Sequence, residues 1–87
     1  MTNLARVSFW RAYAKLNRRQ RAAADAAFRQ FVADAGHPSL HFKKLAGFDN
    51  VWSVRVTLDL RAVGEREGDA IEWVWIGPHD EFDKLFG

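Results

Sequence analysis

The sequence predicts an α+β fold, in which an N-terminal helical hairpin packs on one face of a three- to four-stranded, mainly antiparallel sheet and a short C-terminal helix or tail follows. Two patterns predict it: apolar residues recur at helical spacing up to residue 35, and they alternate along extended segments from residue 40 onward. The length of 87 residues suffices for one domain, which we assign to residues 1–87.

The helical hairpin comes first. A helix is predicted over residues 8–16, because aromatic and aliphatic side chains recur there at helical spacing and Ser8 is a favourable N-cap. Asn17 is placed to cap a second, alanine-rich helix, which Gly36 ends. The apolar face of this second helix consists of Ala24, Ala27, Phe28, Phe31 and Ala35.

Strand patterns occupy the rest of the chain. The segment VWSVRVTL alternates between apolar and polar residues, LRAVGER continues after a turn, and AIEWVWI is apolar on both faces, which predicts an interior strand. Gly77 and Pro78 end that strand, and DEFDKLF is predicted to be a short helix or turn. The predicted strands are residues 41–45, 51–58, 60–66 and 70–76.

The strand pattern brings two arginines together. If residue 58 lies at the tip of a hairpin, Arg55 is directly opposite Arg61 on the sheet face that points away from the helices. Two such guanidinium groups repel each other unless an anion lies between them, and guanidinium groups bind phosphate in a bidentate way. Lys43 or Lys44 would join them from the neighbouring segment. We therefore predict a phosphate-binding sheet face with His79 at its rim.

Simpler interpretations of the same residues stay open. Paired arginines also occur on solvated sheet faces, and His79 would be an ordinary loop residue if Asp80 caps the last helix. Strand parity places Trp52, Trp73 and Trp75 in the core. A tryptophan on the opposite face would instead be placed to stack on a nucleobase.

Composition excludes several classes of function. The chain has no cysteine, so disulfides, thiolate metal sites and thiol nucleophiles are excluded, and no pair of histidines has the spacing of metal ligands. No apolar run is long enough to span a bilayer, and no signal peptide is recognised, so we expect a cytoplasmic protein without a cofactor or a metal.

Four segments in this order resemble the RelE/ParE superfamily of bacterial type II toxins, nearly from end to end: FWRAYAKLNRRQRAAADAAFRQF, HPSLHFKKL, WSVRV with LRAVG, and IEWVWIGPHDEFDKL. The resemblance implies a small α+β domain with an antitoxin as partner. RelE-like members are mRNA endonucleases that work on the ribosome, and ParE-like members inhibit DNA gyrase. The basic strands and His79 favour the RelE-like branch, which implies the ribosome and mRNA as partners.

The resemblance also implies roles for single residues. Arg55 and Arg61 would hold the scissile phosphate, with help from Lys43 or Lys44. His79 would be the acid–base group, and Glu81 would share a proton transfer or orient His79. The predicted reaction is attack of the ribose 2′-OH on the adjacent phosphate.

Phe82 departs from the family pattern, which often has tyrosine there. A phenyl ring packs or stacks but transfers no proton, so we assign Phe82 to substrate binding. Two alternatives remain: a ParE-like gyrase inhibitor without catalytic activity, and a catalytically decayed toxin that only binds its antitoxin.

Overall fold

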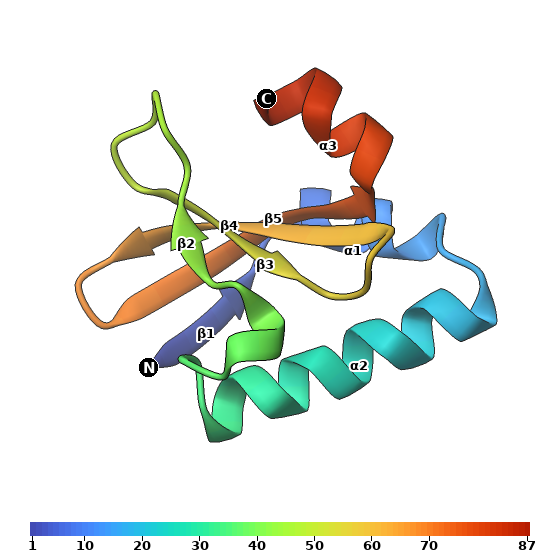
Figure 1. The fold of residues 1–87 in the computed structure, drawn as a ribbon, viewed down its shortest axis with the longest axis horizontal. Coiled ribbons are helices and arrows are strands. Elements are labelled where there is room, and N and C mark those ends of the chain that lie inside the picture. Colours follow the sequence, from blue (N-terminus) through green and yellow to red (C-terminus); the bar gives the residue numbers. More distant parts are fainter.

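The computed structural model describes all residues from Met1 to Gly87 and contains a five-stranded sheet with helices on both faces (Figure 1). In Figure 1 the long helix α2 lies below the strands and α3 lies above them. The elements in chain order are β1 (Thr2–Ala5), α1 (Val7–Ala14), α2 (Arg18–Ala33), a one-turn 3-10 helix (Pro38–Leu40), β2 (Lys43–Lys44), β3 (Val51–Arg55), β4 (Leu60–Glu67), β5 (Ala70–Pro78) and α3 (His79–Phe86).

The predicted fold class is confirmed, and the sheet has one strand more than the sequence pattern indicated. Its order is β1-β5-β4-β3-β2, with β2 to β5 antiparallel and β1 parallel to β5. As predicted, β5 is an interior strand. The four residues of β1 are too few to show an alternating pattern, and only their pairing with a distant strand makes them extended.

The second helix begins as the sequence predicts. The side-chain oxygen of Asn17 accepts a hydrogen bond from the Gln20 backbone N–H at 2.8 Å, and the Gln20 side chain accepts one from the Asn17 N–H at 2.8 Å. This reciprocal capping box satisfies two N–H groups at the start of α2. Within α2, Ala24 and Phe31 are buried, whereas Phe28 from the predicted core face is 47% exposed.

The sequence pattern indicated Ser8 as the N-cap of the first helix, but Ser8 does not cap it. The N-cap of α1 is Arg6, which makes no side-chain cap hydrogen bond, and the Ser8 hydroxyl donates instead to the Val74 carbonyl at 2.7 Å. Val74 needs this donor because the β4–β5 register shifts beside it: Val63 pairs with Trp75 and Gly64 with Trp73. The extra residue is a β-bulge, which leaves Val74 outside the β4–β5 pairs.

This bulge corrects the predicted position of one tryptophan. Strand parity placed Trp73 and Trp75 on the same face, but the extra residue between them turns Trp75 to the other face of the sheet. Trp73 is buried against Phe31 on the α2 side, and Trp75 instead contacts Phe86 of α3.

The main core lies between the sheet and the two N-terminal helices. As predicted, the inward residues of the β3–β4 hairpin point together at the helices. At about 25 cal/mol per Å² of apolar surface, such burial is the main stabilising contribution in a domain of this size. The core residues are Leu16, Ala24, Phe31, Leu40, Val54, Leu60, Ala62, Ile71, Trp73 and Ile76.

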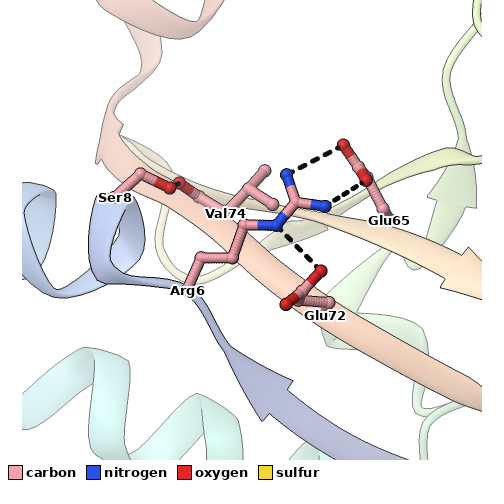
Figure 2. Close-up of polar contacts among 5 residues, drawn as sticks. All are labelled: Arg6, Ser8, Glu65, Glu72 and Val74. Atoms are coloured by element: carbon pink, nitrogen blue, oxygen red, sulfur yellow. Dashed lines mark hydrogen bonds and ion pairs between the residues drawn. The ribbon is translucent and has the colours of Figure 1, made fainter.

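A second set of contacts holds the β1–α1 junction to the opposite sheet face. Glu65 and Glu72 are direct cross-strand partners of like charge, an arrangement that is unfavourable by itself. Figure 2 shows Arg6 reaching both carboxylates, with Nη2 at 2.7 Å from Glu65 Oε1 and Nε at 2.8 Å from Glu72 Oε1. Together with Ser8, Arg6 therefore ties the start of α1 to β4 and β5. No helix in the molecule is both long and apolar enough to cross a membrane.

Candidate functional site: a paired-arginine face beside His79

The two arginines meet as the sequence predicts. Arg55 on β3 is the direct partner of Arg61 on β4, on the sheet face that α3 covers in part. Arg61 in turn is paired with Gly77 on β5, and His79 begins α3 two residues later. The register therefore orders Arg55, Arg61 and Gly77 in one row across three strands, with His79 at its end.

The turn between β3 and β4 fixes Arg61 in place. Its Nη1 donates to the carbonyls of Thr57 at 2.9 Å, Leu60 at 3.2 Å and Leu58 at 3.4 Å. Burial lowers the pKa of Arg61, and the positive charge of Arg55 lowers it further, while the charges of Asp83 and Asp59 act in the opposite direction. Arg61 is therefore a fixed cation whose remaining guanidinium nitrogens donate to no protein group.

Arg55 lacks such anchoring. Its Nε is buried and has no hydrogen-bond partner in the protein. A buried N–H without a partner costs about 1–3 kcal/mol, and more when the group is charged, so native proteins rarely leave one without a function. Arg55 thus carries a buried N–H that no group of the protein satisfies.

Lys43 and Lys44 occupy positions on opposite faces of the sheet. Lys43 is the partner of Ser53, so its position belongs to the arginine face. Lys44 is the partner of Trp52, and its position belongs to the face that the N-terminal helices cover. Because neighbouring strand positions point to opposite faces, only Lys43 is placed to assist the arginine pair.

His79 has one nitrogen engaged and one without a partner. Its Nε2 lies 3.3 Å from Asp83 Oδ2, an i,i+4 contact within α3, and its Nδ1 is buried without a hydrogen-bond partner. No hydrogen bond or ion pair joins Glu81 to His79, because residues two apart on a helix point in different directions. The carboxylate in contact with His79 is thus that of Asp83, and Glu81, which was expected near His79, is exposed.

The alternative of a helix capped by Asp80 is wrong. The N-cap of α3 is Pro78, no side chain caps the helix, and Asp80 lies in the first turn. His79 is instead the first helical residue, and its backbone N–H donates to the Asp59 carbonyl in the turn that also holds Arg61. This contact fixes the start of α3 beside the arginine pair.

Phe82 packs rather than reacts. Its ring is nearly parallel to the imidazole of His79, at an angle of 17° and a centroid distance of 6.3 Å. Phe82 also contacts Phe86 one turn later, at a centroid distance of 5.7 Å. The ring of Phe82 therefore lies between His79 and Phe86 along α3.

Sequence reasoning missed two residues of this site. The i,i+4 spacing of His79 and Asp83 was a usable signal, but the helix was predicted to start after the histidine. Trp75 was assigned to the core because strand parity does not reveal a bulge. No group of three or more histidine and carboxylate side chains converges in the way that metal ligands do.

A separate groove of about 690 Å³ lies on the other side of the sheet, and most of its lining is apolar. Residues of α1, α2, β1 and the sheet form its walls, and Trp10 on one helix and Phe28 on the other are 55% and 47% exposed. The groove is therefore separate from the arginine pair, which the sheet carries on its opposite face.

The comparisons with known proteins agree with this architecture. The model of the ParE-like toxin domain matches residues 18–84, which include the arginine pair, His79 and Asp83. The chain belongs to the ParE-like toxin domain family. Comparison with curated protein sequences gave no match.

Solved structures of toxins share the fold of this ParE-like domain. It is similar in fold to a chain of the RelB–RelE antitoxin–toxin complex from Methanococcus jannaschii, with 16% identity, a TM-score of 0.76 and coverage of 97% of this chain and 99% of the other. The YoeB/ParE toxin from Agrobacterium tumefaciens has 20% identity and a TM-score of 0.70, over 91% and 99%. YafQ from Escherichia coli has 11% identity and a TM-score of 0.68, over 98% and 97%.

Proposed function

We propose that this ParE-like domain is the toxin of a bacterial type II toxin–antitoxin pair and that it cleaves mRNA on the ribosome without a metal ion. One observation supports the catalytic part most directly. Arg55 Nε and His79 Nδ1 are the two buried side-chain nitrogens without a hydrogen-bond partner, and both belong to the same site. A cation without an anionic partner and a histidine nitrogen without a hydrogen bond suit a ribose–phosphate substrate.

The contacts of His79 suggest which nitrogen acts. If Nε2 carries the proton and donates a hydrogen bond to Asp83, the lone pair of the neutral imidazole is on Nδ1. Because Nδ1 is buried, the imidazole would have to turn before Nδ1 takes the proton of the ribose 2′-OH as that oxygen attacks the adjacent phosphorus. The carboxylate of Asp83 would stabilise the imidazolium that forms.

The arginine pair meets the charge that builds on the phosphate. As the 2′ oxygen bonds to phosphorus, the negative charge on the non-bridging oxygens increases, and the terminal guanidinium nitrogens of Arg55 would receive it. Arg61, held by the turn carbonyls, would donate a hydrogen bond to the departing 5′ oxygen. The departing 5′ oxygen takes a proton from water and the imidazolium of His79 returns its proton to solvent, so the products are a 2′,3′-cyclic phosphate and a free 5′-OH. The chain supplies few acid–base groups, so the ribosome would align the mRNA.

Growth arrest after induction without antitoxin tests this assignment. We expect His79→Ala and Arg55→Ala to abolish arrest, because they remove the base and the free cation. Arg19→Ala removes an exposed arginine from α2 and serves as the matched control, with arrest retained. Full toxicity of His79→Ala would show that the acid–base assignment is wrong.

The antitoxin is proposed to dock away from this site. Two of the similar structures are RelE–RelB complexes, from Methanococcus jannaschii and Pyrococcus horikoshii. In this chain the apolar groove between α1 and α2 would take an amphipathic antitoxin segment, whose acidic residues would meet the arginines of α2. Alanine at both Trp10 and Phe28 should weaken the complex at least tenfold in a titration while growth arrest persists. Undiminished affinity would place the antitoxin elsewhere.

A second candidate function is inhibition of DNA gyrase, which the ParE-like description of the family favours. Incorporation of labelled amino acid and of labelled thymidine after induction separates the two functions. Early loss of amino-acid incorporation supports mRNA cleavage, and early loss of thymidine incorporation supports gyrase as the target. Harmless expression would favour a catalytically decayed toxin. Phe82→Tyr would then test whether the tyrosine that the family often has at this position restores toxicity.

A further inference from the structure

Beside the arginine pair lies an aromatic surface whose role the proposed chemistry leaves open. The bulge at Val74 places Trp75 on this face, and its indole lies across Gly77 so closely that a β-carbon there would be 2.5 Å from the ring. Gly77 is the direct partner of Arg61. The flat side chain of Trp75 is therefore adjacent to the cation that is predicted to hold phosphate.

Two phenylalanines from other segments extend this surface. Phe86 near the end of α3 lies 5.7 Å from Trp75 between ring centroids, and Phe48 in the β2–β3 loop lies 6.4 Å from Phe86. We call Phe48, Trp75 and Phe86 the aromatic platform. Figure 1 shows that the β2–β3 loop and α3 rise on the same side of the sheet, and Phe48 of the loop and Phe86 of α3 meet there.

The register relates this platform to the cations. Lys43, Ser53, Val63 and Trp75 are successive partners in one row across the sheet. The neighbouring row contains Arg55, Arg61 and Gly77 and lies two residues along the strands, about 7 Å away. Cationic side chains beside exposed aromatic rings are what proteins use to bind single-stranded nucleic acid, with phosphates on the former and bases on the latter.

A purely structural role explains only part of the cluster. Val63 and Ser53 beneath it are buried, so the rings do shield this sheet face from water. A ring needed only for shielding would itself be covered, yet Phe48 remains 39% exposed at the open end of the cluster. No residue of α3 is fully buried either, so Phe86 also keeps surface that a ligand can contact.

We infer that the aromatic platform binds a nucleobase of single-stranded RNA by stacking, next to the phosphate held by Arg55 and Arg61. The inference rests on the proposed nuclease function and adds a base-binding site to it. Phe48 is its most exposed member, and its removal disturbs the fold least.

Cleavage of a defined mRNA on translating ribosomes tests the inference. Phe48→Leu keeps an apolar side chain but removes the ring, and we expect kcat/KM to fall about tenfold and the preference for particular bases at the cut sites to weaken. Phe48→Trp keeps a stacking surface and should stay within about twofold of the unmodified toxin. Val32→Ala removes an exposed apolar side chain from α2 and should change nothing.

The outcomes separate the two proposals. Cleavage by Phe48→Leu with unchanged rate and unchanged cut sites would overturn the stacking site and leave the nuclease intact. Loss of rate that Phe48→Trp does not rescue would also overturn it, because apolar contact rather than stacking would then explain the loss. Absence of cleavage by the unmodified toxin would overturn the proposed function, and the base-binding site with it.

Discussion

Replacing Gly77 with alanine tests the position of Trp75, on which the base-binding site depends. A β-carbon at residue 77 would lie 2.5 Å and 2.8 Å from two carbons of the indole ring. Favourable carbon contacts are at about 3.5–4.0 Å, so the ring must move by about 1 Å or more. The backbone cannot yield instead, because Gly77 is paired with Arg61 inside the sheet.

The expected cost follows from this overlap. Overpacking of this kind typically destabilises a protein by about 1–3 kcal/mol. For a domain of this size each kcal/mol lowers the melting temperature by roughly 4–8 °C, so Gly77→Ala should lower it by about 4–24 °C. In a Trp75→Leu background the ring is absent, and the added methyl should cost less than about 0.5 kcal/mol.

Thermal and urea unfolding of the two single variants and the double variant measure this coupling. The double-mutant cycle should give an interaction free energy of about 1–2 kcal/mol, with Trp75→Leu relieving the effect of Gly77→Ala. Gly36→Ala is the matched control, because its β-carbon would meet nothing closer than 3.5 Å and should cost little. An equal loss of stability from Gly77→Ala in both backgrounds would refute the proposed overlap of ring and backbone.

Three further predictions concern other parts of the fold. Burial, and then the hydrogen bond to Asp25, raises the pKa of Tyr13, the only tyrosine, so its ultraviolet titration should lie above that of free tyrosine and move down in Asp25→Asn. Because the folded pKa is raised, the stability that depends on protonated Tyr13 is complete below pH 10 and is lost as pH rises through the folded pKa. An unshifted titration of Tyr13 would contradict this expectation. Asn17→Ala should lower the free energy of unfolding by about 1 kcal/mol through loss of the capping box, and a urea midpoint equal to the original would argue against the cap. Arg6→Gln should lower the melting temperature by leaving two carboxylates opposed, and adding Glu72→Gln should recover part of the loss, whereas additive losses would exclude this mechanism.

Much of the arginine pair was predictable from local pattern. The alternation along β3 and β4, with a short turn between them, sets the hairpin register, and that register alone makes Arg55 and Arg61 partners. The position of His79 followed from Gly77 and Pro78, which end a long apolar strand. These features depend on neighbours in sequence, so a single chain reveals them.

The orienting carboxylate was harder to assign. His79 and Asp83 meet only because α3 begins at the histidine itself, one residue before the expected start. Element ends depend on contacts outside the element, and here the His79 N–H donates to the Asp59 carbonyl of a distant turn. The sequence had instead pointed to Glu81.

By itself the sequence determined the fold class, the helix cap at Asn17, the arginine pair and the toxin family. The tertiary structure alone decided that Trp75 lies beside these arginines and that β1 joins the sheet. Both depend on the bulge in β5 and on side chains from the chain's beginning: Ser8 satisfies the Val74 carbonyl at the bulge, and Arg6 binds across β4 and β5. Contacts between residues more than fifty positions apart leave no periodic signal in either segment. Their contribution to the site therefore cannot be predicted from the sequence pattern and is found only in the folded structure.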